Sequence, residues 1–155
     1  MLTDDMKDLV AGTMLCFAGT INEDGSPNLS PKSSLRVHDD RHLLFANMAS
    51  PGTADNLRRD PRIELNCVDI FSRRGYRFTG KANLFSDGDP IYEALRRDVA
   101  AEHGDSLPVY DAVLIEVLQA SPVISPAYTF VEGVTEEILR NAYCGKYGVQ
   151  PLEVQ

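Results

Sequence analysis

Residues 14–37 of the chain read MLCFAGTINEDGSPNLSPKSSLRV, and this stretch decides the fold class. The apolar run at 14–21 predicts a strand. The segment NEDGSP at 22–27 predicts a turn, because Gly25 accepts a positive φ and Pro27 ends the turn. A second strand is expected at 28–37, so the two strands form an antiparallel hairpin.

The rest of the sequence extends this pattern to about six strands. Alternating or apolar segments predict further strands at 42–47, 62–70, 75–85 and 111–124. Capping and periodicity signals predict peripheral helices near 4–11, 51–59, 89–103 and 133–145. Because most strands are joined without an intervening helix, we expect a mainly β protein, a six-stranded antiparallel barrel with helices outside it, as a single domain over residues 1–155.

Composition and charge exclude several classes of protein. With 155 residues, 43% hydrophobic and 25% charged, the chain is neither disordered nor fibrous. Its formal net charge of -8 opposes a general nucleic-acid or anionic-membrane binder. No segment approaches the roughly 18 consecutive apolar residues that span a bilayer, and the start MLTDDMKDLV is acidic where a signal peptide is basic. We therefore expect a cytoplasmic protein without nucleic-acid or membrane partners.

The charge is unevenly distributed along the chain. Residues 28–77 hold nine Lys and Arg against six Asp and Glu, although the chain as a whole is acidic. A net-positive middle favours a site for a small anion. Solvated strand edges and helix ends are the alternative explanation.

Two segments carry the polar groups that such an anion site requires. In the first, Pro31 interrupts a strand and predicts an edge or a bulge, beside one ammonium and several hydroxyls. In the second, ANMASPGT at 46–53 runs from a strand into a helix N-terminus, where free amides and the helix dipole favour a phosphate. A Ser-Pro helix start is more often ordinary helix capping than a ligand site, and this is the alternative explanation for the second segment.

The remaining reactive side chains predict neither a metal site nor a catalytic group. The three cysteines lie 51 and 77 positions apart, and the three histidines have no metal-ligand spacing. Tyr128 and Phe130 are expected to close the barrel core, with coverage of a planar ligand as the alternative. The catalytic residues thus stay unknown.

Three segments, in this order and spacing, resemble the pyridoxamine 5'-phosphate oxidase-like FMN-binding split-barrel family. They are INEDGSPNLSPKSSLRV at 21–37, LLFANMASPGTADNLRRDPRIEL at 43–65 and GYRFTGKANLF at 75–85. The resemblance implies a six-stranded antiparallel split β-barrel that forms a homodimer, with FMN in clefts between the subunits. It also implies an oxidoreductase in which the flavin transfers a hydride or electrons to or from a small-molecule substrate or electron donor.

The resemblance assigns site residues by position. Those expected to line the flavin and its ribityl-phosphate chain are Ser30, Pro31, Lys32, Ser33 and Ser34. Those expected along the isoalloxazine edge are Asn47, Met48, Ala49 and Ser50. Thr53 and Asn56 are expected near the phosphate, and Arg73 and Arg74 are candidates to reach the flavin from the partner chain.

Two departures from the family pattern leave alternatives open. Where many relatives carry basic residues at the helix start, this chain has Gly52 and Thr53, so the counter-charge must come from Lys32 or an arginine. The substrate-binding Arg and His pattern of true pyridoxamine phosphate oxidases is not seen in 131–155, so vitamin B6 oxidation is not expected. The alternatives are the same barrel binding a deazaflavin or haem, and a non-catalytic binding module that has lost the cofactor.

Overall fold

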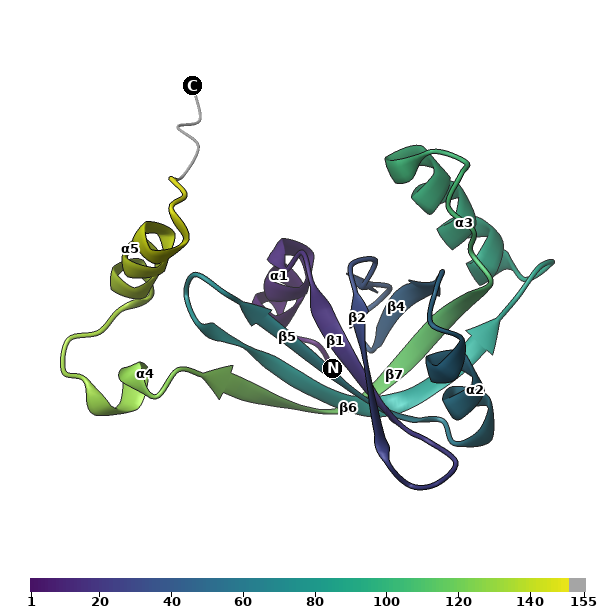
Figure 1. Ribbon diagram of the computed structural model, residues 1–155, viewed down its shortest axis with the longest axis horizontal. Coiled ribbons are helices and arrows are strands. Elements are labelled where there is room, and N and C mark those ends of the chain that lie inside the picture. The colour runs from purple at the N-terminus through teal and green to yellow at the C-terminus, as the bar shows by residue number, and fades with distance from the viewer. Residues whose placement is uncertain (151–155) are drawn as a thin grey trace.

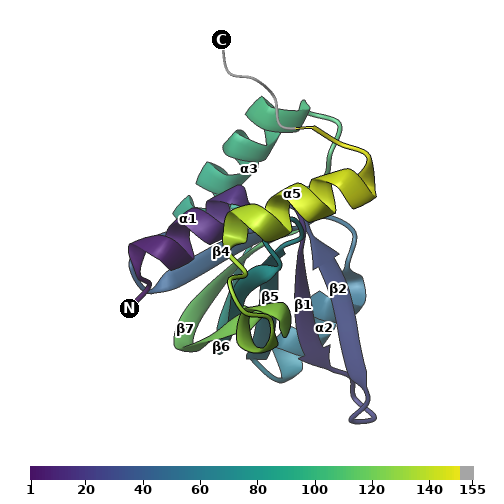
Figure 2. The ribbon, with the colours of Figure 1, turned by 90° about the vertical axis from the view of Figure 1, so that its left-hand side faces the viewer.

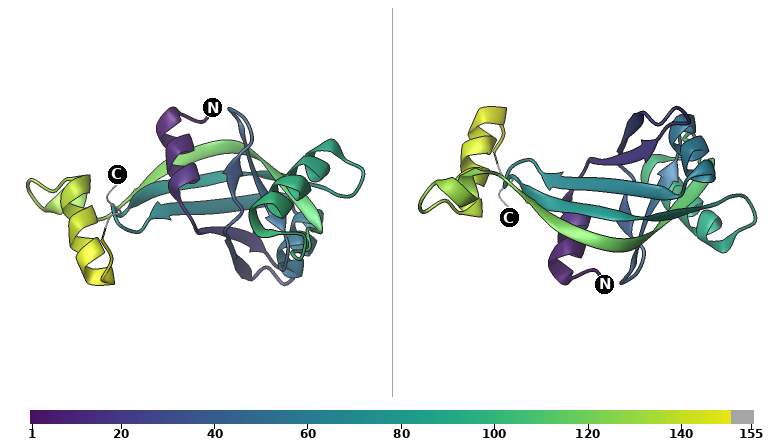
Figure 3. Two further views of the ribbon diagram at one scale, coloured as in Figure 1. Left: turned by 90° about the horizontal axis from the view of Figure 1, so that it is seen from above. Right: turned by 90° about the horizontal axis from the view of Figure 1, so that it is seen from below.

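The computed structural model describes residues 1–150, and its centre is one curled, seven-stranded antiparallel sheet (Figure 1). The sheet order is β2-β1-β5-β6-β7-β4-β3. The strands are β1 (Cys16–Ile21), β2 (Pro27–Lys32), β3 (Arg36–Val37), β4 (His42–Asn47), β5 (Arg62–Asp69), β6 (Arg74–Phe85) and β7 (Asp111–Ile124). Figure 3 shows the curl from above and below. The expected mainly β split barrel is confirmed.

The strand count is seven rather than six because the segment expected as one strand at 28–37 is broken. β2 pairs with β1, whereas β3 pairs with β4, at the opposite edge of the sheet. Residues 33–35 therefore carry the chain from one edge of the curled sheet to the other. The hydroxyl of Ser34 accepts a hydrogen bond from the Ala46 amide at 3.0 Å, in place of a strand-to-strand bond.

The helices begin where the local sequence provides a cap. They are α1 (Asp4–Gly12), α2 (Pro51–Arg59), α3 (Pro90–His103), α4 (Ala127–Phe130) and α5 (Glu136–Tyr147). The Asp89 side chain caps α3 by accepting from the Ile91 amide, and Thr135 caps α5 in the same way, so α5 starts later than the expected 133. In Figure 2, α1, α3 and α5 lie above the sheet and α2 lies below them. The last five residues of the expected 1–155 domain lie outside the described residues.

Two apolar clusters stabilise the sheet, one on each face of β4. Leu43 and Phe45 pack into the barrel interior with Phe78. Leu44 packs on the opposite face, in the cluster that includes Leu95 of α3. Because α3 covers the outer face, β4 is buried on both sides, and each large apolar side chain buried there contributes about 1.5–3 kcal/mol.

The segment that follows β7 lies beyond the barrel. The β5–β6 hairpin and the end of β7 extend past the other strands toward α4 and α5 (Figure 1). Phe130 of α4 is 82% exposed, so the expectation that it closes the core is wrong. The Tyr128 hydroxyl instead donates to the Ser72 carbonyl at 2.5 Å and ties α4 to the β5–β6 turn. Within residues 1–150, every helix is too short or too polar to cross a lipid bilayer.

Candidate functional site

The break between β2 and β3 leaves a hollow beside the start of α2. It has a volume of about 220 Å³ and is open to solvent. Its walls come from the two segments that the sequence singled out. The lining residues are Ser30, Pro31, Lys32, Ser33, Ser34, Ala46, Met48, Ala49 and Ser50.

Lys32 is the only cationic side chain that lines this hollow. Side chains alternate along β2, so Ser30 and Lys32 share its inward face. The Lys32 ammonium donates to Ser30 Oγ at 2.5 Å, to Ser50 Oγ at 2.9 Å and to the Pro31 carbonyl at 3.3 Å. It also lies 5.2 Å from the centre of the Phe45 ring. All of these partners are neutral.

Burial changes the protonation of Lys32. The residue is only 6% exposed, and removal of water from the ammonium lowers the pKa of Lys32 to about 8. Within residues 1–150, no carboxylate pairs with it. A bound anion would therefore bring the negative charge that this buried cation lacks.

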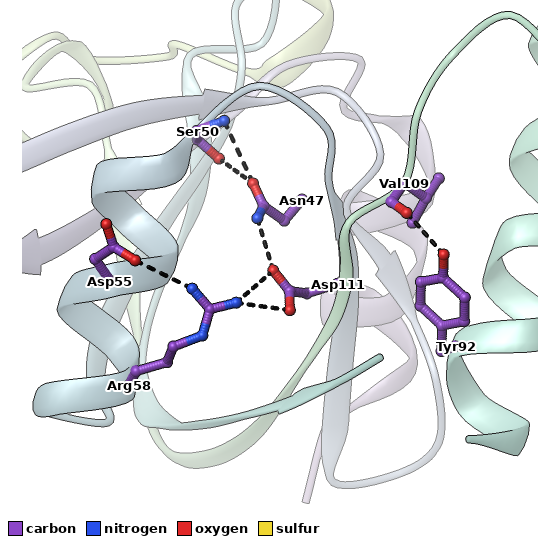
Figure 4. Close-up of polar contacts among 7 residues, drawn as sticks. All are labelled: Asn47, Ser50, Asp55, Arg58, Tyr92, Val109 and Asp111. Atoms are coloured by element: carbon purple, nitrogen blue, oxygen red, sulfur yellow. Dashed lines mark hydrogen bonds and ion pairs between the residues drawn. The ribbon is translucent and has the colours of Figure 1, made fainter. Parts of the chain in front are cut away.

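Behind Ser50, a row of hydrogen bonds leads to a buried carboxylate (Figure 4). Asn47 Oδ1 accepts from the Ser50 hydroxyl at 3.0 Å and from the Ser50 amide at 3.3 Å. Asn47 Nδ2 donates to Asp111 Oδ2 at 2.8 Å. Arg58 of α2 donates to both oxygens of Asp111, at 2.8 and 3.0 Å. The start of α2 is thus fixed to the beginning of β7.

The hydroxyl of Ser50, the residue before α2, is used in this network and does not cap the helix amides. Pro51 occupies the first turn, where its missing N–H is tolerated. The positive end of the helix dipole therefore lies next to the Lys32 ammonium, and both favour an anion at the hollow.

Thr53 and Asn56 do not line the hollow, although the family resemblance placed them near a phosphate. Thr53 Oγ1 accepts from Asn28 Nδ2 at 3.1 Å. Asn56 Nδ2 donates to Thr20 Oγ1 at 3.0 Å and to Asn22 Oδ1 at 2.9 Å. Both side chains are buried against the β1–β2 hairpin, and they hold α2 on it.

Arg73 lies in the β5–β6 turn and Arg74 begins β6, and neither lines the hollow of its own chain. Arg73 has a positive φ of 61° and its guanidinium lies 4.7 Å from the centre of the Tyr143 ring. Arg74 pairs with Asp5 at 2.5 Å and also with Glu136. Their expected contribution to a flavin held by a partner chain stays a prediction.

Sequence reasoning missed Asp111, which lines a neighbouring hollow of about 490 Å³ that also contains Met48, Ala49 and Ser50. The available signal was a carboxylate at the first position of the apolar strand segment DAVLIEVL at 111–118. Its partner Asn47 is 64 positions away, and only the strand register brings them together: Asn47 and Asp111 are direct cross-strand neighbours. Within residues 1–150, no group of His, Cys, Asp and Glu side chains is placed to hold a metal ion.

An apolar groove of about 510 Å³ lies on the outer face of β1, β2 and β5. Leu29 is 68% exposed there, and Phe17 and Ile70 are also exposed. Asn66 lies in the same groove, and its Oδ1 is buried without a hydrogen-bond partner in the described structure. Because buried acceptors are usually paired, Asn66 Oδ1 is a position at which a donor from outside this chain could bind.

Comparison with known proteins gives a consistent result for the fold. The family described as pyridoxamine 5'-phosphate oxidase matches residues 2–140. HupZ of Group A Streptococcus is similar in structure, with 28% identity, a TM-score of 0.71 and coverage of 81% of this chain and 96% of that one. No match is found among curated proteins.

Two more distant structures share the fold. An FMN-binding protein from Syntrophomonas wolfei has 13% identity and a TM-score of 0.69, with coverage of 77% of this chain and 84% of that one. HutZ, the heme storage protein of Vibrio cholerae, has 14% identity and a TM-score of 0.61, with coverage of 79% and 94%. At these identities the likeness concerns the fold alone.

Proposed function

The chain belongs to the pyridoxamine 5'-phosphate oxidase family, and from that premise we propose that it binds FMN as a flavin-dependent oxidoreductase. One observation carries the proposal: the buried ammonium of Lys32 has only neutral partners and lies beside the start of α2. A phosphate group fits this donor set, because charge-assisted hydrogen bonds from an ammonium, hydroxyls and helix amides are the usual means of holding one.

The surroundings of Lys32 suit a flavin phosphate better than a free inorganic anion. Met48 and Ala49 line both the hollow at Lys32 and the larger hollow beside it, so the walls are partly apolar. Small-molecule sites typically combine such walls with a few fixed polar anchors. In this proposal Lys32 and Ser30 hold the phosphate end, Ser50 orients the Lys32 ammonium, and Met48 and Ala49 lie along the ring system.

The proposal includes a homodimer. The hollow of about 220 Å³ is smaller than the roughly 300–1,000 Å³ of typical ligand pockets, so one chain does not enclose a flavin there. Leu29 and Pro31 lie on the outer face of the strand whose inner face carries Lys32. A second copy of the chain packed on the apolar groove would cover Leu29 and supply a donor for Asn66 Oδ1. It would also lie next to the hollow at Lys32.

When bound, FMN supplies the hydride or electron transfer to or from a small-molecule substrate or electron donor. The chain's own residues would bind and orient it: Lys32 offers charge, Ser30 offers a hydroxyl, and the start of α2 offers the positive end of the helix dipole. The apolar side chains of the hollow and of a covering second copy exclude water. No side chain of the hollow is assigned a role in proton transfer.

A haem or a deazaflavin in the same barrel is the competing ligand. A haem requires an axial side chain, most often histidine or cysteine. None of the three histidines, His38, His42 and His103, lines a hollow described above, and His42 is hydrogen-bonded to Asp39. The hollow at Lys32 thus offers a cation for a phosphate and no histidine or cysteine for haem iron, which supports FMN.

The test is the visible spectrum of the purified protein, recorded before and after addition of FMN and removal of excess flavin by gel filtration. We expect retained flavin bands, about one FMN per chain, in a fraction that elutes as a dimer. Parallel samples receive haemin or a deazaflavin. Colourless protein after FMN, with retention of one of the other ligands, would contradict the proposal, and retention of none would favour a non-catalytic module.

A further inference from the structure

Asp111 does not line the hollow at Lys32, but it determines how the Asn47 side chain is oriented. An ionised carboxylate only accepts hydrogen bonds, so the Asn47 group at 2.8 Å from Asp111 Oδ2 must be the amide NH₂. The carbonyl Oδ1 of Asn47 then faces Ser50, where it accepts from both the Ser50 amide and the Ser50 hydroxyl. The flipped amide would place its carbonyl oxygen against the Asp111 carboxylate and its NH₂ group against the Ser50 amide N–H, so neither contact would be a hydrogen bond.

The orientation of Asn47 in turn fixes the orientation of Ser50. Because the Ser50 hydroxyl donates its proton to Asn47 Oδ1, it presents a lone pair to the Lys32 ammonium at 2.9 Å. Every bond in the row Lys32, Ser50, Asn47, Asp111 therefore points from donor to acceptor toward the carboxylate. Asn47 and Asp111 are both buried, so water does not readily replace a lost partner.

We propose that Asp111 is a positioning residue for the anion site: through Asn47 and Ser50 it holds the Lys32 ammonium at the start of α2. The inference rests on the proposed binding of a phosphate at Lys32. Asp111 does not line the hollow at Lys32, and its effect on a phosphate there passes through the orientation of one amide side chain.

The experiment must distinguish this positioning role from a purely structural role of Asp111. Arg58 joins both oxygens of Asp111 and also Asp55, so the ion pair by itself fastens α2 to β7. Arg58 is half-exposed, whereas Asn47 is buried. With asparagine at position 111, the single carbonyl oxygen is therefore expected to accept from buried Asn47, and Arg58 can turn to water or to Asp55.

This difference predicts that stability and anion binding separate among three variants. Asp111→Ala, Asp111→Asn and Arg58→Gln all remove the ion pair, and urea unfolding should show all three as less stable than the wild type. Only Asp111→Ala removes the acceptor for Asn47. Calorimetric titration with FMN and with inorganic phosphate should show affinity about fivefold weaker or more in Asp111→Ala, and within twofold of wild type in the other two.

A second readout does not depend on any ligand. Hydrogen exchange of the Ser50 backbone amide, followed by NMR, reports the bond to Asn47 Oδ1 directly. We expect faster exchange in Asp111→Ala and unchanged exchange in Asp111→Asn and Arg58→Gln, each compared at conditions where global unfolding is negligible.

The outcomes distinguish this inference from the proposed function. If Asp111→Ala binds FMN as the wild type does, or if Arg58→Gln weakens binding as much as Asp111→Ala, Asp111 is structural only and the inference fails while the function stands. If the wild type binds neither FMN nor phosphate, the proposed function fails. Ser50 exchange then decides the positioning role, with unchanged exchange in Asp111→Ala overturning it.

Discussion

Lys32 Nζ and Ser50 Oγ lie 2.9 Å apart, so a cation from β2 reaches the residue that precedes α2. The helix itself has no basic residue in its first turn, where Gly52 and Thr53 stand; Arg58 and Arg59 are in its last turn. At the proposed anion site the positive charge therefore comes from a neighbouring strand. This arrangement also explains why Lys32 is buried without a carboxylate partner.

Removal of the Lys32 charge should weaken flavin binding. In Lys32→Gln we expect FMN affinity to fall by about 10- to 150-fold, because a charge-assisted hydrogen bond contributes about 1.5–3 kcal/mol. Quenching of FMN fluorescence measures the dissociation constant. Lys81→Gln, at an exposed position on β6, is the matched control and should bind as the wild type does. Equal affinity in all three proteins would remove Lys32 from the site.

The affinity for FMN should fall as the pH rises through and above 8. Burial lowers the pKa of Lys32 to about 8, so the ammonium is charged below that pH and increasingly neutral above it. The FMN phosphate, with a second pKa near about 6, keeps its charge over this range. The groups facing Lys32 are two hydroxyls, a carbonyl and the Phe45 ring, and none of them titrates there.

The same Lys32 titration predicts the sign of a stability change in the ligand-free protein. An unfolded lysine stays protonated up to a pKa of about 10.4, so between about pH 8 and 10.4 the unfolded chain binds more protons than the folded one. Lys32 thus makes the free energy of unfolding rise with pH in that window. Urea unfolding of wild type and Lys32→Gln, taken as a difference at each pH, isolates this contribution, and a flat difference would contradict it.

The apolar groove predicts where the subunits of the proposed homodimer meet. Leu29→Asp should convert the dimer to a monomer and release FMN, because a carboxylate at the centre of an apolar contact is left without a partner. Since Leu29 is 68% exposed in one chain, the fold of the monomer should persist. Light scattering coupled to gel filtration measures the mass. The control Leu118→Asp changes an exposed leucine on β7 outside the groove and should stay dimeric.

Close packing of β6 on β7 predicts that Gly80 tolerates no side chain. A Cβ at Gly80 would lie 2.3 Å from the Glu116 carbonyl oxygen, next to the irregular pairing between Thr79 and Gly80. We expect Gly80→Ala to lower the free energy of unfolding by about 1–3 kcal/mol. Gly52→Ala, in α2 with no atom within 4 Å of the added Cβ, should instead stabilise by about 0.5–1 kcal/mol. Denaturant unfolding compares the two.

Local sequence signals were sufficient for most of the secondary structure. Gly25 has a φ of 82° in the turn that the sequence predicted, and Asp89 caps α3 at the predicted Asp-Pro start. These features depend on residues within a few positions of one another, so they can be read in the chain. The break between β2 and β3 at residues 33–35 could not be predicted from local sequence. It arises because β2 pairs with β1 while β3 pairs with β4 at the opposite edge of the sheet.

For the candidate site, the sequence by itself identified the polar groups on irregular backbone, above all Lys32 and Ser50. Only the tertiary structure decided which of these groups share a space. Thr53 lies on the face of α2 that packs against the β1–β2 hairpin, where it accepts a hydrogen bond from Asn28. Asp111 contacts Asn47 because the two residues are direct neighbours in the pairing of β4 with β7. A shift of one residue in the pairing of β4 with β7 would place the Asn47 and Asp111 side chains on opposite faces of the sheet. That register is set by packing of both faces of β4, a property of the whole sheet that no local segment contains.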